Sequence, residues 1–247
     1  MLRRLLPLAV LAFALAGCGL DSAAGDDAQA RFSMQEPDFS SEAMFALRFS
    51  TGNRVALGDI RNRAETEAGH QENQPVVTEL PAPLRGSDLN VRSWQGAFGG
   101  VGLVLYNERV TAMLETYEGK SISASRFENE LKYYTESISR MKETGGSDPV
   151  PTVVKGRFVE YRFWETNRQR LMLCLYTPPD GKVKITVAAG FREIMDALRM
   201  SPLSARDDQA KTDEMLAPLE GKSLPSSPAP SPSPGDLTTP NPGMQGS

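Results

Sequence analysis

The strongest constraint on the fold is an alternation of apolar and polar residues in the C-terminal half of the chain. Three segments, Val153–Glu165, Arg168–Thr177 and Lys182–Ala188, place apolar side chains at every second position. Successive side chains of a strand point to opposite faces, so this period predicts strands with one buried and one wetter face. Only residues 166–167 and 178–181 separate the segments. Turns this short join antiparallel neighbours, so we predict a three-strand antiparallel meander.

One long amphipathic helix is predicted between residues 118 and 144, because apolar residues recur there at steps of four and three. These residues are Phe127, Leu131, Tyr134, Ile138 and Met141. Shorter helices are predicted at Phe191–Met200 and Ala205–Leu216. The resulting fold class is α+β, with a twisted antiparallel sheet packed against the long helix and the shorter C-terminal helices.

The N-terminal half is less regular. Gly100–Tyr106 and Val110–Tyr117 have the composition and closeness of a hairpin. Ala43–Phe49 is strand-like. Gly58–Arg85 is polar and predicts a long surface loop, with a short helix at Asp59–Ala68. The sequence does not assign a role to this polar stretch.

The first residues follow the layout of a secretory signal. Arg3 and Arg4 precede an apolar stretch, Leu5–Leu15, which is shorter than the roughly 20 residues that a spanning helix needs. Two small residues then lead into Cys18.

The Leu15-Ala16-Gly17-Cys18 ending resembles the lipobox of bacterial lipoproteins. In that family the signal is cut before the cysteine, which carries a diacylglyceryl thioether and usually an N-acyl chain such as palmitate. The resemblance implies a lipid anchor on Cys18 and a location in the cell envelope. Gly19 lacks the aspartate that marks inner-membrane retention in enterobacterial members, which favours the outer membrane if the host has one. Cys174 would then have no disulfide partner.

Two polar segments flank the predicted domain. Residues 18–41 are small, polar and acidic, and predict a lipidated cysteine followed by a flexible tether. From Leu224 onward proline, serine and glycine dominate, which predicts a disordered tail over 224–247. The chain therefore divides into a signal peptide (1–17), the tether (18–41), a single α+β domain (42–223) and the tail.

From Gly100 to Pro202 the order of elements is similar to the end of PsbP/Mog1-like domains: a hairpin, a long helix, a strand entered at Gly156, two further strands and a final helix. Those domains place a twisted antiparallel sheet between helices, and several are bacterial lipoproteins. The polar stretch Gly58–Arg85 departs from the family's compact start. The family has no shared catalytic residues, so the resemblance implies no site residue here.

Few residues of the chain suit catalysis or metal binding. His70 is the only histidine, and with two cysteines it falls short of a zinc ligand set. Gly119 and Gly221 each precede lysine, but neither follows another glycine at the spacing of a phosphate-binding loop. The net charge of −4 argues against a general nucleic-acid binder. We expect no metal, no cofactor and no enzymatic activity.

Charged residues leave two alternatives open. Carboxylates at Glu115, Glu118, Glu128 and Glu130 would serve a glycosidase only if two of them faced each other across a cleft, which spacing does not show. Five cations of the predicted sheet form either a solvated strand face or a basic contact face for acidic lipid head groups or an acidic partner. They are Arg162, Arg168, Arg170, Lys182 and Lys184.

The sequence thus predicts a membrane-anchored envelope lipoprotein that acts as a non-catalytic binding or assembly module, with an envelope protein among its expected partners. The alternative is a carrier that holds a small apolar ligand or lipid between the sheet and the long helix. Such a carrier needs an apolar cavity of roughly 300 Å³ or more. A hydrolase is the minor alternative.

Overall fold

The computed structural model describes residues 32, 36–39, 44–69, 76–78, 80, 84–119, 122–142, 150–178 and 181–216. The predicted signal peptide, Cys18, His70 and the predicted tail lie outside these residues. Among the helices that are described, none has the length and apolar character needed to cross a membrane.

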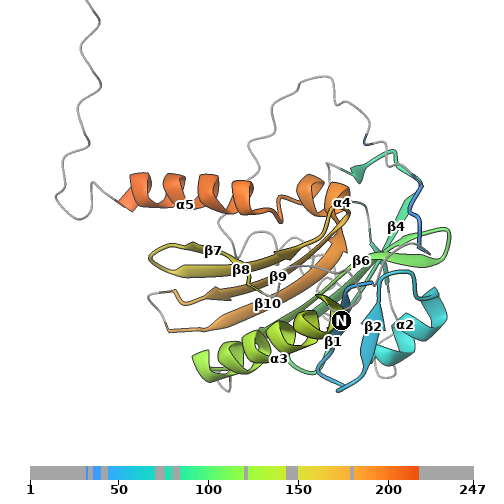
Figure 1. The fold of residues 1–247 in the computed structure, drawn as a ribbon, viewed down its shortest axis with the longest axis horizontal. Helices are drawn as coiled ribbons and strands as arrows, with labels where there is room; N and C mark the ends of the chain where they lie inside the picture. The colour runs from blue at the N-terminus through green and yellow to red at the C-terminus, as the bar shows by residue number, and fades with distance from the viewer. Residues whose placement is uncertain are drawn as a thin grey trace, which may run out of the picture.

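An eight-stranded sheet forms the middle of the protein (Figure 1), and all of its neighbouring strands are antiparallel. The α+β class with an antiparallel sheet, predicted from the sequence, is therefore confirmed. In spatial order the strands are β3 (Val76–Thr78), β4 (Leu89–Gln95), β5 (Gly100–Tyr106), β6 (Arg109–Glu118), β10 (Lys184–Phe191), β9 (Gln169–Tyr176), β8 (Val159–Glu165) and β7 (Thr152–Lys155).

Two runs of sequential strands meet in the centre of this sheet. β3 to β6 form the first run and β7 to β10 the second, and the last strands of the two runs pair with each other. The chain passes between the runs through α3 (Ala124–Lys142). The centre of the sheet therefore depends on contacts between segments that are far apart in sequence.

Both faces of the sheet are covered (Figure 1). One face carries α3, α2 (Arg61–Glu67) and a separate two-stranded ribbon of β1 (Ala46–Arg48) and β2 (Arg54–Ala56). The other carries α4 (Arg192–Ala197) and α5 (Pro202–Leu216). In β9, Leu171 and Leu173 belong to the first core cluster, whereas Met172 and Cys174 belong to the second. The expectation of a wetter strand face is therefore wrong for β9, because helices cover both of its sides.

Several strand assignments differ from the sequence prediction. The segment Val153–Glu165 is divided into β7 and β8, because the Gly156 N–H donates to the Val159 carbonyl (2.8 Å) and closes a turn. β2, β3 and β4 were not predicted, and the prediction of a surface loop over Gly58–Arg85 is wrong at β3, which pairs with β4 at the edge of the sheet. β4 ends at a tight glycine turn, where a Cβ on Gly99 would lie 2.1 Å from the Thr116 carbonyl oxygen. That close approach of two backbones requires glycine.

Part of the segment expected to be tether packs on the fold. The Phe39 ring meets Phe191 edge to face, with ring centroids 5.7 Å apart. It also lies over Gly58, where a Cβ would be 2.9 Å from the ring. Asp38 pairs with Arg168 at 3.5 Å. Phe32 packs against the second core cluster as well, so residues well before the predicted domain start belong to the folded unit.

Helix α3 supplies a direct test of the packing. Ile138 is 1% exposed in the first core cluster. Ile138→Ala should lower the free energy of unfolding by about 2–5 kcal/mol, through lost burial and the cavity left behind. Urea unfolding of the two proteins measures the difference. The matched control is Lys132→Ala, because the Lys132 side chain is 78% exposed and its loss should cost less than about 0.5 kcal/mol. Equal losses would contradict this assignment of the buried face.

Candidate functional site

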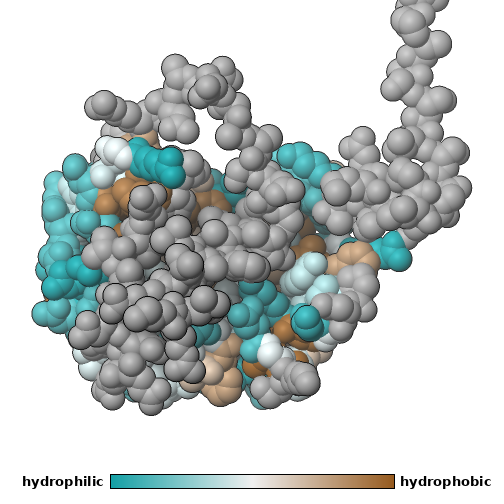
Figure 2. All heavy atoms as spheres, turned by 180° about the vertical axis from the view of Figure 1, so that it is seen from behind, coloured by the Kyte–Doolittle hydropathy of each residue, from teal (hydrophilic) through white to brown (hydrophobic). Residues whose placement is uncertain are grey.

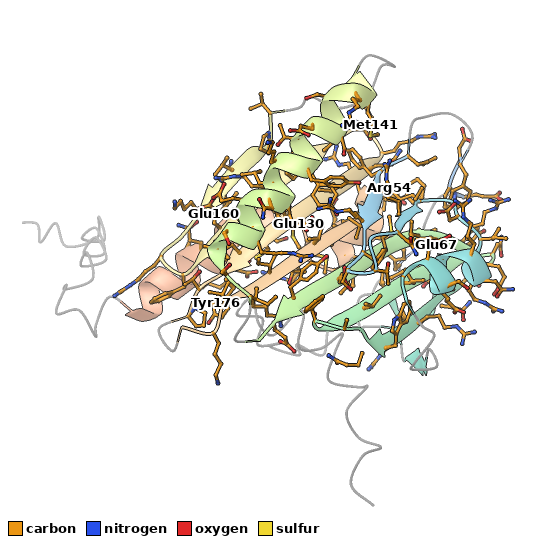
Figure 3. All side chains as sticks on the ribbon, turned by 90° about the horizontal axis from the view of Figure 1, so that it is seen from below. Arg54, Glu67, Glu130, Met141, Glu160 and Tyr176 are labelled. Carbon is orange, nitrogen blue, oxygen red and sulfur yellow. The ribbon has the colours of Figure 1, made fainter. Side chains whose placement is uncertain are left out.

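A pocket of about 410 Å³ opens between the turn that joins β1 to β2 and the first half of α3. Charged and polar residues make up most of its lining, which consists of Arg48, Phe49, Ser50, Gly52, Arg126, Asn129 and Glu130. Figure 3 shows β1 and β2 lying beside α3, which carries Glu130. The rear surface in Figure 2 shows hydrophilic residues with apolar ones between them.

Glu130 is the centre of the pocket's charged groups. It is 1% exposed, although it comes from a helix at the surface. Nη2 of Arg48 donates to both Glu130 oxygens at 3.3 Å. Nε of Arg126 lies 3.3 Å from one of the same oxygens. A buried carboxylate needs such partners, because an unpaired charge in the interior is strongly destabilising.

Each of these arginines also stacks on a tyrosine ring. The Arg48 guanidinium carbon lies 3.8 Å from the centroid of the Tyr133 ring, and that of Arg126 lies 4.4 Å from the Tyr117 ring. Guanidinium groups are attracted to aromatic faces, and the stacking restricts their rotation. The two guanidinium groups are thus fixed both by a carboxylate and by a ring.

A second buried carboxylate, Glu115, lies beside this group. Its oxygens accept the Ser50 N–H at 2.9 and 3.1 Å and the Tyr117 hydroxyl at 2.7 Å. Burial raises the pKa of Glu115 above its ordinary value of 4.5, while the bonds from Ser50 and Tyr117 act in the opposite direction. Burial and the nearby Glu115 also raise the pKa of Tyr117 well above its usual range, so Tyr117 stays a donor.

These bonds limit the chemistry that the pocket supports. Both buried carboxylates accept bonds from protein donors and are at most 2% exposed, so a reacting water or sugar has little access to their oxygens. Within the described residues, no three histidine, cysteine, aspartate or glutamate side chains are grouped so that they would hold a metal ion. The arrangement instead offers two oriented cations to a ligand, which is binding chemistry.

The five cations of the predicted basic contact face do not come together in the structure. Arg170 is 2% exposed and is enclosed by Glu165, Asp196 and the Met200 carbonyl. It joins β9 to α4. The prediction of a contact face is therefore wrong for Arg170, because burial in ion pairs removes it from the surface.

The other four cations are dispersed. Arg162 pairs with Glu160 along β8. Arg168 pairs with Asp38, and Lys184 lies 3.9 Å from Glu118. Lys182 is exposed just before β10. They lie on different strands and loops and do not form one continuous surface.

Sequence reasoning found some of the pocket and missed the rest. The sequence analysis considered both Glu115 and Glu130 as acids. In the structure Arg126 forms an ion pair with Glu130, and its charge also acts on Glu115. The helical spacing of Arg126 and Glu130 (i, i+4) was an available signal. Arg48 had no such signal, because its contacts with α3 span more than eighty residues of sequence.

The comparisons with known proteins give this chain no relative. No protein-family model, no curated protein and no solved structure matches it.

Glu115 makes stability depend on pH in a predictable direction. Its pKa is higher in the folded protein than in the unfolded chain, so the folded state holds the proton more tightly. The stability that Glu115 contributes is therefore fully present below pH 4.5 and is lost as pH rises through the raised pKa, by about 1.4 kcal/mol for each unit of increase in the pKa. Glu115→Gln removes this charge, so wild type should lose stability relative to this variant as pH rises above 4.5.

Urea unfolding of wild type and Glu115→Gln between about pH 4 and about pH 8 measures this difference in stability. Tyr117→Phe is the informative second variant. It removes a donor to the charged carboxylate, so the loss of stability should extend to higher pH. Wild type gaining on Glu115→Gln with rising pH would show that Glu115 is stabilised in its charged form.

Proposed function

We propose that this protein is a lipid-anchored, non-catalytic binding module of the cell envelope, and that the pocket between the β1–β2 turn and α3 is its binding site. One observation carries the proposal. The two buried carboxylates of the site are committed to protein donors, while Arg48 and Arg126 are held in fixed positions at a pocket. Fixed charges around a pocket favour recognition, because little ordering is needed when a ligand binds.

The anchoring part of the proposal rests on the N-terminal sequence. The apolar stretch before Cys18 is too short to span a membrane and ends in a lipobox-like tetrapeptide. We propose that Cys18 carries the lipid and that the outer membrane is the destination if the host has one. Because Phe32 and residues 36–39 pack on the fold, the proposed tether covers only residues 19–31. That length gives an average reach of about 20 Å.

The finer fold proposal is a PsbP/Mog1-like sandwich, with the three-strand meander and the long helix as its second half. Helices on both faces of an antiparallel sheet support it, as do the successive pairings of β8, β9 and β10. This resemblance brings no catalytic residue with it. The role of the polar stretch Gly58–Arg85 is not part of the proposal.

The carrier alternative has less support. The space between α3 and the sheet is occupied by large buried side chains: Phe127, Tyr134 and Ile138 from α3 and Trp164, Leu171 and Leu173 from the sheet. A carrier would need an apolar cavity between these elements. A hydrolase would need an acid or base that is not already engaged. We retain the binding module, with an envelope protein or an acidic group as its partner.

The anchor is tested by lipid labelling of cells that produce the full chain. Wild type should incorporate labelled palmitate and remain with the membrane fraction, and Cys18→Ala should incorporate none. Each buried methylene contributes about 0.8 kcal/mol to membrane attachment. A cysteine that carries two or three acyl chains therefore holds the protein firmly, whereas a single chain would hold it only marginally. Cys174→Ala is the matched control, because Cys174 is buried in the second core cluster. Palmitate on Cys18→Ala, or none on wild type, would refute the anchor.

A further inference from the structure

We infer that Arg48, Arg54 and Arg126 form a binding site for an oxyanion, namely the phosphate or carboxylate group of a ligand. The inference deepens the proposed function, because it names the chemistry that the binding module recognises. It starts from an unfavourable arrangement of charge at the edge of the pocket.

Arg48 and Arg54 face each other across the β1–β2 ribbon. They are paired directly in the register of the two strands, so their side chains leave the same face of the ribbon. Like charges directly opposite each other are destabilising in an antiparallel pair. Arg54 is exposed, and none of the described residues forms a hydrogen bond or ion pair with it. Local arrangements that cost stability are found most often where function requires them.

The positive charge at the pocket is not balanced. Arg48 and Arg126 line it, Arg54 lies opposite Arg48 in the ribbon, and Glu130 is the one described carboxylate that forms an ion pair with any of the three. The other buried carboxylate, Glu115, accepts the Ser50 N–H and the Tyr117 hydroxyl. A bound anion would reduce the repulsion between Arg48 and Arg54 and use the excess charge.

Donors remain available at both lining arginines. The side-chain bonds of Arg48 within the described residues all use Nη2, so the other nitrogens of its planar fork are not committed there. Nε of Arg126 is buried against Glu130, and none of the described residues forms a hydrogen bond with its Nη1 or Nη2, which leaves those two nitrogens for a ligand. Guanidinium groups bind phosphate and carboxylate through two parallel N–H bonds, and this fit explains why arginine rather than lysine is used.

The pocket has the size for such a ligand. Its volume of about 410 Å³ lies in the range of small-molecule sites and exceeds what an inorganic ion needs. The oxyanion is therefore expected to be one end of a larger molecule. A phosphorylated or carboxylated small molecule and the head group of an anionic lipid share this chemistry, and the experiment separates the two sources.

The test uses the full chain in non-ionic detergent micelles and measures its thermal unfolding temperature. Inorganic phosphate is the probe in one series, and micelles that contain phosphatidylglycerol in place of phosphatidylcholine are the probe in the other. A ligand that binds only the folded state raises the unfolding temperature. Isothermal titration with phosphate gives the dissociation constant.

Arg126→Gln should weaken phosphate binding by about tenfold or more, because it removes a charge-assisted pair of hydrogen bonds. Arg54→Gln should also weaken it by about tenfold. In phosphate-free buffer, however, Arg54→Gln should raise the unfolding temperature, because it relieves the repulsion from Arg48. These opposite effects distinguish a ligand site from a structural role. The matched control is Arg63→Gln, an exposed arginine on α2 that should change neither measurement.

The results separate the ligand sources. Arginine-dependent stabilisation by phosphate supports a soluble ligand, and stabilisation by phosphatidylglycerol alone supports a lipid head group. Stabilisation by neither probe, or equal stabilisation of wild type and Arg126→Gln, overturns the inference. Neither result affects palmitate labelling of Cys18, so failure of the oxyanion site and failure of the lipid anchor are distinguishable.

Discussion

Buried side chains hold the ribbon of β1 and β2 in place, because their oxygens accept backbone N–H groups that a neighbouring strand would otherwise accept. β1 pairs with β2 alone, so its other edge would leave backbone N–H groups without partners. Gln169 of β9 accepts the Phe45 N–H at 2.8 Å, Tyr134 of α3 accepts the Arg48 N–H at 3.1 Å, and Glu115 of β6 accepts the Ser50 N–H. A buried donor without a partner costs about 1–3 kcal/mol, so these acceptors fix where the ribbon lies.

The candidate site follows from this attachment. The N–H of Arg48 is fixed by Tyr134, so its side chain begins within reach of Glu130 and the Tyr133 ring. The cost is a desolvated carboxylate, Glu115, whose pKa is raised by burial. A hydrophobic contact would avoid that cost but would leave the Ser50 N–H without its acceptor. The protein thus gives up some stability at neutral pH for a defined position of the pocket wall, as is common where geometry matters for function.

Periodicity correctly predicted the elements that pack one regular face against the core. It failed where the burial of a residue depends on contacts with segments far away in the sequence. α3, β9 and β10 carry their patterns locally, because each packs a regular stripe or face against the core. β4 alternates only weakly, and its buried polar Ser93 interrupts the pattern. The sequence predicted Arg170 to be a surface cation, but in the structure it is paired with Asp196 of α4. The ribbon's acceptors lie between 65 and 124 residues from their donors, beyond any local pattern.

Helices cover both faces of the sheet. The pocket and the packing of Phe32 and Phe39 lie on different faces of it. The pocket belongs to the face with α3 and the ribbon, whereas Phe32 and Phe39 pack against the second core cluster, on the face with α4 and α5. The sheet therefore separates the pocket from the packing of Phe32 and Phe39.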